Sequence, residues 1–334
     1  MSTETNHFPV AVVGLGLMGC SITTCLLMAG HPVVAVAPIP EDLEHAERRI
    51  RAHLRKSQQE GLVMQDPEFF LERLVITGDY EQLKNSRLVI ECTIENLEIK
   101  KTVYGKIEAV IAADALMASN TSAIPISILQ QLTQRPERFF GLHWAEPSHT
   151  TRFLEVICGD RSNEALGEQL YALAHQWGKE PTLVRKDIRG FITNRLMYAM
   201  YREAFHLVEN GYATVEDVDR ACRNNPGYWM TLAGVFRWMD LTGVPAYLTV
   251  LKDLWPTLSN ATEPPKLITD IVAAGGRGVA NGKGFYEYTP EEARLWEETF
   301  SAFSFEIRDL ALKYPADVVK RRLAEKEGFV NETV

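Results

Sequence analysis

A charge-free stretch near the start of the chain limits the possible folds more than any other feature. From Phe8 to Pro40 there is no Asp, Glu, Lys or Arg. The stretch is long enough to cross a bilayer, but several glycines interrupt it, and Pro9 and Pro32 bracket it. Parallel strands that are covered on both faces also read as continuous apolar runs. A buried strand–helix–strand unit therefore explains the stretch better than a membrane span.

The motif GLGLMG lies between the first strand and the helix of this unit. The pattern predicts a strand over residues 10–13, a helix over 17–29 and a second strand over 33–36. The motif fits G-x-G-x-x-G: its first glycine permits a tight turn, its second lets backbone approach a pyrophosphate, and its third allows close packing of helix on strand. The alternative is a glycine-rich turn without a ligand. The predicted dinucleotide-binding residues are Gly14, Leu15, Gly16, Leu17, Met18 and Gly19.

The end of the second strand bears on the choice of dinucleotide. An acidic residue usually stands there to bond the ribose hydroxyls, but this chain has Ala37. Glu41 or Asp42 could take that role from the next helix. No arginine directly follows the strand to bind a 2′-phosphate, since Arg48 and Arg49 come later. We therefore expect NAD rather than NADP.

Further along the chain, strand-like and helical segments alternate, and then the pattern changes. Alternation of this kind predicts a doubly wound parallel sheet with helices on both faces. Residues 139–143 and 153–158 are strand-like and joined by a short loop, so they could form an antiparallel pair. After residues 182–184 we expect helices only. The prediction is an α/β domain over residues 1–186 followed by an all-α domain over residues 187–334.

Composition excludes several classes of partner. The chain has 334 residues, a formal net charge of -9 and no stripe of Lys and Arg interleaved with aromatic residues, so nucleic acid is not expected. Its five cysteines are odd in number and lie in no paired metal spacing, which predicts buried thiols in a reducing compartment and no metal site. Residues 1–7 lack the features of a secretory signal. We expect a cytoplasmic protein.

Polar residues follow two of the predicted strands. Glu95 and Lys100 come after the strand that ends near residue 92, and Asn120 and Ser122 follow the next strand. The carboxyl ends of strands in an open α/β sheet face the ligand crevice, so these side chains are candidates to touch a cofactor. The alternatives are a solvated first helical turn with an ordinary ion pair, and simple caps and turns.

His143 and Glu155 form the candidate for acid–base chemistry. His143 ends one strand of the predicted antiparallel pair, and Glu155 lies in the other. A turn centred near residue 148 or 149 would make them cross-strand neighbours. A carboxylate bonded to one ring nitrogen fixes the tautomer and raises the basicity of the other, which suits a general base that removes a hydroxyl proton. The alternative is a satisfied histidine in the core of a sheet.

These motifs together carry a family resemblance over nearly the whole chain. The ordered motifs are GLGLMG, IENLEIKK, SNTS, GLHWAEPSHTTRFLEVI, GFITNR and GKGFYEY. In order and spacing they resemble the L-3-hydroxyacyl-CoA dehydrogenase family. The resemblance implies a Rossmann-type domain followed by a helical, dimer-forming domain, NAD as cofactor, a small-molecule substrate and a place in fatty acid metabolism.

The resemblance also implies a role for each matching residue. His143 would be the general base, with Glu155 orienting it, while Ser122 and Asn194 would bond the substrate oxygen. Three further residues, Glu95, Lys100 and Asn120, would line the nicotinamide and its ribose.

Three departures from the family pattern concern the substrate and the cofactor. Ala37 replaces the ribose-binding Asp, Ala123 replaces a second Ser, and Glu146 replaces an Asn in the loop after the histidine. Glu146 would put a negative charge near the substrate carbonyl or point to solvent. In the aromatic-rich segment 227–240, Arg237 could pair with a free carboxylate; the alternative for that segment is core packing at a dimer contact.

Three functions follow from these observations. The first is an NAD-dependent dehydrogenase of 3-hydroxyacyl-CoA. The second is a dehydrogenase of a free 3-hydroxy acid or a carnitine-like alcohol, as in the family's relatives L-gulonate 3-dehydrogenase and carnitine dehydrogenase. The third is a crystallin-like structural protein that binds NAD(H) without useful turnover.

Overall fold

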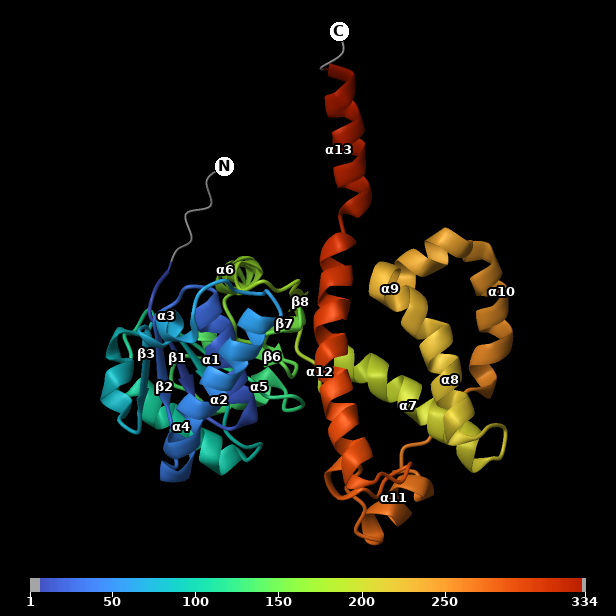
Figure 1. The fold of residues 1–334 in the computed structure, drawn as a ribbon, viewed down its shortest axis with the longest axis horizontal. Helices are drawn as coiled ribbons and strands as arrows, with labels where there is room; N and C mark the ends of the chain where they lie inside the picture. Colours follow the sequence, from blue (N-terminus) through green and yellow to red (C-terminus); the bar gives the residue numbers. More distant parts are fainter. Residues whose placement is uncertain (1–6, 332–334) are drawn as a thin grey trace. The chain divides into compact units, whose positions relative to one another are not determined.

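The computed structural model describes residues 7–331, which fall into two compact units divided between Arg195 and Leu196. The first unit is built on a sheet in the order β3-β2-β1-β4-β5-β6-β7-β8. Helices of this unit, among them α1 and α2, lie beside the sheet (Figure 1). All neighbouring strands pair in parallel except β6 and β7, which are antiparallel. The predicted α/β class is confirmed. The strands are β1 (Val10–Val13), β2 (Val33–Val36), β3 (Leu74–Thr77), β4 (Leu88–Glu91), β5 (Leu116–Ser119), β6 (Phe139–Trp144), β7 (Leu154–Cys158) and β8 (Thr182–Val184).

Two hydrophobic clusters, one on each face of the sheet, explain the charge-free start of the chain. Alternate residues of β1 enter different clusters: Val10 and Val12 pack in one, Ala11 and Val13 in the other. Strand side chains point alternately to the two faces, so both faces of β1 are buried and neither tolerates a charge. The helices of this unit are α1 (Leu17–Met28), α2 (Pro40–Gln59), α3 (Pro67–Leu71), α4 (Leu97–Glu108), α5 (Ile126–Leu129) and α6 (Glu164–Gln176).

The second unit is helical, and no strand follows β8 in the part of the chain that the structure describes. Only Ser304 and Phe305 of this unit are buried among its described residues. Within residues 7–331, none of the helices combines the length and the apolar composition that a membrane span requires. The helices are α7 (Thr193–Glu209), which begins in the first unit, α8 (Val215–Asn224), α9 (Pro226–Thr242), α10 (Val244–Leu254), α11 (Lys266–Ala273), α12 (Pro290–Lys313) and α13 (Val318–Asn331).

Candidate active site

The glycine loop has the geometry that its motif predicts. Gly14 has a φ of +102°, and a Cβ there would lie 2.8 Å from the carbonyl carbon of Cys92. A Cβ on Gly19 would lie 1.8 Å from the carbonyl oxygen of Gly14, whereas one on Gly16 would meet nothing within 4 Å. The first and third glycines are therefore required by packing, and the second leaves open space for a ligand.

The first turn of α1 fits a pyrophosphate. Gly16 caps the helix without a side-chain hydrogen bond, and the first turn has no acidic residue. Free amide groups and the positive end of the helix dipole favour an anion at this position. The residues present therefore fit the phosphates of a dinucleotide.

Arg49 is a neighbour of this loop that the sequence did not single out as a site residue. From α2 its Nη1 donates to the carbonyl oxygen of Leu15 at 3.4 Å. The position of Arg49 in the sequence, beyond the end of the second strand, gives no sign of this contact, because the contact depends on how α2 packs on α1. Ala37 itself is almost fully buried, and its amide donates to the carbonyl oxygen of Thr77 at 2.9 Å.

A buried polar cluster lies at the carboxyl end of β4 and centres on Glu91. Glu91 was not singled out as a site residue from the sequence. The Glu91 carboxylate is fully buried. It accepts hydrogen bonds from Lys100 Nζ at 2.9 and 3.0 Å, from Ser119 Oγ at 2.7 Å and from Tyr104 Oη at 3.0 Å. Burial and then the Glu91 carboxylate raise the pKa of Tyr104 well above its usual range, so the phenol remains a donor. Because β4 is apolar up to Ile90, the sequence pattern marks Glu91 only as the last residue of a strand and gives no sign of its partners.

Lys100 connects this cluster to the predicted cofactor-lining residues. Its side chain is 1% exposed, and its Nζ lies 3.5 Å from Oε2 of Glu95. Glu95 also accepts hydrogen bonds from Thr121 Oγ1 at 2.7 Å and from the amide of Ser122 at 2.8 Å. The structure thus brings Glu95, Lys100 and Ser122 together, with Lys100 below the surface.

Two predicted amide side chains hold the backbone around the site. Asn194 donates from Nδ2 to the carbonyl oxygen of Ser122 at 2.7 Å. Asn120 accepts at Oδ1 from the amide of Trp144 at 3.0 Å. Asn120 therefore connects the end of β5 to the residue that follows His143. These contacts join Glu95, Lys100, Ser122 and Asn194, and Asn120 is connected to them through Glu91, whose carbonyl oxygen accepts from the Asn120 amide at 2.8 Å.

The predicted cross-strand pair is present. His143 and Glu155 are register partners of β6 and β7, and Nδ1 of the imidazole lies 2.8 Å from Oε2 of the carboxylate. Burial raises the pKa of Glu155, but the bonds from His143 and from the amides of Thr193 and Ile192 outweigh it, so the pKa is lowered overall. The carboxylate engages Nδ1, and Nε2 is the ring nitrogen that Glu155 does not contact.

The start of α7 fixes the second oxygen of the Glu155 carboxylate. Oε1 accepts from the amides of Ile192 at 3.0 Å and Thr193 at 2.9 Å. Gly190 and Phe191 precede them with φ values of +79° and +52°. A positive φ is rare for a bulky residue, and here it turns the chain into the helix. Phe191 is fully buried, and its ring centroid lies 5.6 Å from that of His143.

Two further residues that were predicted to contact substrate, Glu146 and Arg237, lie in different units. Glu146 is half-buried in the loop after β6; burial raises its pKa, and hydrogen bonds from Ser21 and Ser148 oppose the shift. Its Oε2 has no hydrogen-bond partner among the described residues. Arg237 is exposed on α9 of the second unit. Their contact with substrate remains a prediction.

Comparisons with known proteins match the chain over both units. The family "3-hydroxyacyl-CoA dehydrogenase, NAD binding domain" matches residues 9–188, and "3-hydroxyacyl-CoA dehydrogenase, C-terminal domain" matches residues 190–288. The 5-formyl-3-hydroxy-2-methylpyridine 4-carboxylate 5-dehydrogenase of Mesorhizobium japonicum is 33% identical over 286 residues, which are 85% of this chain and 92% of that protein. The human mitochondrial hydroxyacyl-coenzyme A dehydrogenase is 31% identical over 289 residues, 84% of this chain and 90% of that protein.

Solved structures agree with these matches. A structure of the 5-formyl-3-hydroxy-2-methylpyridine 4-carboxylic acid 5-dehydrogenase, described as an NAD+-dependent dismutase, has a TM-score of 0.85 and 30% identity, and covers 91% of this chain and 98% of its own. The (S)-3-hydroxybutyryl-CoA dehydrogenase PaaH1 from Ralstonia eutropha has a TM-score of 0.70 and 29% identity. The match covers 85% of this chain and 100% of that chain. With its glycine loop, its buried carboxylate–imidazole pair and both family domains, the chain belongs to the 3-hydroxyacyl-CoA dehydrogenase family and is an NAD-dependent dehydrogenase.

Proposed function

We propose that His143 is the general base that takes the proton from the substrate hydroxyl while hydride leaves the same carbon, and returns it in the reverse reaction. The hydrogen bond of 2.8 Å between His143 Nδ1 and Glu155 Oε2 is the observation that supports this role best. It fixes the tautomer in which Nε2 is the free acceptor. NAD supplies the hydride chemistry when it is bound, and the protein supplies orientation and charge placement.

In this proposal the substrate oxygen is bonded by Ser122 and Asn194, and the nicotinamide and its ribose are lined by Glu95, Lys100 and Asn120. The shared network supports the grouping, since Glu95 accepts from the amide of Ser122 and Asn194 donates to its carbonyl. A donor held in place before the reaction stabilises developing charge at little reorganisation cost.

Two substrate classes have support. Matches to both family domains and to the human enzyme favour a 3-hydroxyacyl-CoA. The higher TM-score to the pyridine carboxylate dehydrogenase, 0.85 against 0.70 for the 3-hydroxybutyryl-CoA enzyme, favours a small free acid that carries a carbonyl or hydroxyl group. With a free acid, Arg237 would pair with the substrate carboxylate, and Glu146 would lie near its carbonyl.

An assay of NADH absorbance with a panel of substrates separates these classes. The panel contains acetoacetyl-CoA, free 3-keto and 3-hydroxy acids, carnitine and an aromatic carboxylate bearing an aldehyde. Turnover of acetoacetyl-CoA supports the first class and would mean that Glu146 is compatible with an acyl-CoA substrate. Turnover of a free acid alone, lost in Arg237→Gln and kept in the exposed control Arg223→Gln, supports the second. Cofactor binding without turnover of any compound would favour the crystallin-like alternative.

We further propose that the protein is a cytoplasmic homodimer with a functional boundary near Lys186, between domains 1–186 and 187–334. The helical unit supports the dimer, because it exposes large apolar side chains that a monomer of this family would leave in water. They include Tyr228, Leu232, Phe236, Leu248, Trp296 and Phe300. A role in fatty acid metabolism would follow from acyl-CoA turnover.

A further inference from the structure

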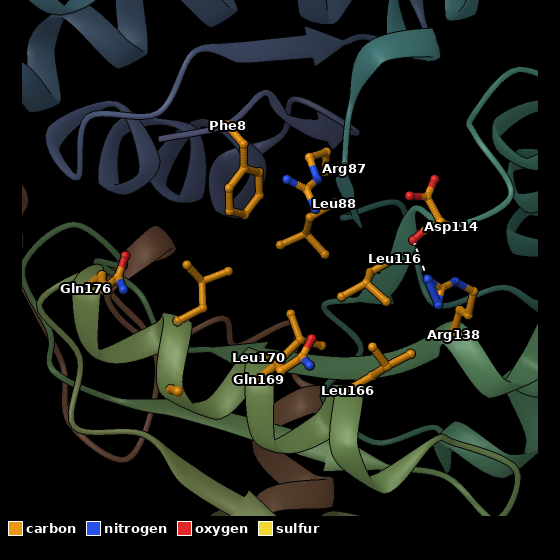
Figure 2. Close-up of a pocket in the computed structure, with 12 residues that line it drawn as sticks. Phe8, Arg87, Leu88, Asp114, Leu116, Arg138, Leu166, Gln169, Leu170 and Gln176 are labelled. Atoms are coloured by element: carbon orange, nitrogen blue, oxygen red, sulfur yellow. Dashed lines mark hydrogen bonds between the residues drawn. The ribbon is translucent and has the colours of Figure 1, made fainter. Parts of the chain in front are cut away.

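A cavity of about 390 Å³ lies at the amino edge of the sheet (Figure 2). Leu88 begins β4 and Leu116 begins β5, and both line it. The candidate catalytic and cofactor-binding residues instead follow the carboxyl ends of these strands. Strand β4 thus separates the cavity from the Glu91 cluster, and the reaction proposed above does not use the cavity.

Apolar and polar side chains share the wall of the cavity. Side chains from the amino ends of the strands face side chains from α6 across it (Figure 2). Its volume is within the range of small-molecule pockets, which combine apolar walls with a few polar groups. The apolar lining consists of Phe8, Leu88, Leu116, Leu166, Leu170, Ala172 and Leu173.

Two arginines supply the positive charge of the cavity. The guanidinium of Arg87 lies 5.5 Å from the ring centroid of Phe8. Arg138 donates from Nη2 to the carbonyl oxygen of Asp114 at 2.6 Å, while its Nε is buried without a hydrogen-bond partner in the described chain. Neither arginine forms an ion pair with any residue between 7 and 331 that the structure describes.

A second hollow of about 230 Å³ shares Arg87 and Asp114 with the first and adds Lys84 and Ser86 to its lining. Ser86 is 2% exposed, and its hydroxyl has no hydrogen-bond partner among the described residues. A buried hydroxyl normally has a partner. Lys84, Ser86 and Arg87 therefore offer two cations and a hydroxyl donor beside the apolar cavity.

Asp114 restricts the charge of a ligand. Its backbone carbonyl oxygen accepts the hydrogen bond from Arg138 (Figure 2), so its carboxylate is not neutralised by that arginine. Because Asp114 lines both hollows, a ligand with two negative charges would meet more repulsion than one with a single charge. A monocarboxylate fits this balance better than a phosphate.

We propose that the amino edge of the sheet binds a small organic monocarboxylate. The carboxylate is bound by Arg87, with Lys84 and Ser86 beside it, and the apolar body of the ligand enters the leucine-lined cavity. This site is separate from the active site and binds its ligand without any covalent step.

Titration calorimetry with octanoate as the probe tests the site on the full chain saturated with NAD+. Octanoate is expected to bind one site per chain, and octan-1-ol and acetate to bind more weakly, because one lacks the charge and the other the apolar body. Arg87→Gln is expected to weaken octanoate binding by roughly tenfold or more, as losing a charge-assisted hydrogen bond does. Arg161→Gln, an exposed arginine outside both hollows, is the matched control.

Three results would overturn the site. They are equal octanoate affinity in the wild type and Arg87→Gln, tighter binding of inorganic phosphate than of octanoate, and displacement of octanoate by a turnover substrate. Arg87 is exposed, so its replacement should leave the thermal midpoint unchanged. Leu166→Gln, which adds a polar group to the cavity wall, is a second variant and should weaken octanoate but not acetate.

Discussion

At the scale of single residues, His143 is the group on which turnover depends most directly. His143→Ala is expected to reduce kcat by ~10²–10⁴, the usual cost of losing a general base. NADH affinity should change little, because the glycine loop is untouched. His175→Ala removes an exposed imidazole on α6 and should leave kcat unchanged. Stopped-flow turnover and NADH fluorescence titration measure the two quantities, and unchanged turnover would remove His143 from the mechanism.

Glu155 in the same site makes the free energy of unfolding depend on pH. Its pKa in the folded protein is lowered from the usual 4.5, so its charged form stabilises the fold above that ordinary value. This contribution is lost as pH falls through the lowered pKa of the folded state. Urea unfolding should therefore show the wild type more stable than Glu155→Gln at pH 7, with the difference shrinking below about pH 4.5. A difference that stays constant down to pH 3 would contradict the charge argument.

Residues predicted well from the sequence are those whose role depends on a local pattern. His143 and Glu155 are near the ends of two strands joined by one short loop, so their register follows from the position of the turn between them. Glu91 and Arg49 could not be found this way. Glu91 is a partner for side chains from α4 and β5, and Arg49 reaches the glycine loop only because α2 packs on α1. Contacts between separate elements leave no periodic signal in one sequence.

At the scale of elements, the glycines of the turn into α1 have different roles. Gly19 is required for packing, whereas Gly16 leaves space for a ligand. Gly19→Ala is expected to destabilise the fold by roughly 1–3 kcal/mol, because its methyl would overlap the carbonyl oxygen of Gly14. Gly16→Ala should leave the thermal midpoint unchanged, since a Cβ there meets nothing within 4 Å. It should instead weaken NAD binding, by roughly tenfold if about 1.4 kcal/mol is lost. Equal effects of both changes on unfolding would refute this division.

The ion pair between α4 and β4 gives the next prediction. Lys100→Met leaves the fully buried Glu91 without its cation and is expected to cost about 3–5 kcal/mol of unfolding free energy. The double change Glu91→Gln with Lys100→Met removes both charges and should recover most of that loss. Denaturant unfolding of the wild type, of Lys100→Met and Glu91→Gln singly, and of the double variant measures the coupling. Additive losses would show that the pair contributes little.

In the first unit the order of the main strands and helices was predictable to within a few residues at their ends, because both faces of the sheet impose strong patterns, whereas the second unit was predicted only as helical. The predicted strands at residues 10–13, 33–36 and 182–184 have the observed bounds. The C-terminal helix α13 (Val318–Asn331) agrees with the helices expected after residues 182–184. The kink at Gly234 within α9 was missed, since one glycine inside an aromatic-rich run gives no reliable sign of it.

At the scale of the whole molecule, the exposed apolar surface of the helical unit predicts association. Sedimentation equilibrium is expected to give the mass of a dimer. Phe236→Glu, at a side chain that is 83% exposed on α9, should shift the protein toward the monomer because it would bury a charge. Phe69→Glu makes the same change on α3 of the first unit and serves as control. A monomeric wild type at micromolar concentration would refute the proposed homodimer.

The position of helix α7 across the unit boundary limits where this chain can be cut or recombined. The first unit ends at Arg195, yet one of the two amides that hold Glu155, that of Thr193, belongs to a helix that continues to Glu209. A fragment that stops at the unit boundary would keep its nucleotide-binding motif but retain only the first three residues of that helix. A chimera that exchanges helical units should therefore place its junction beyond residue 209. Helix α7 then stays whole, and Glu155 keeps the amide that holds it beside His143.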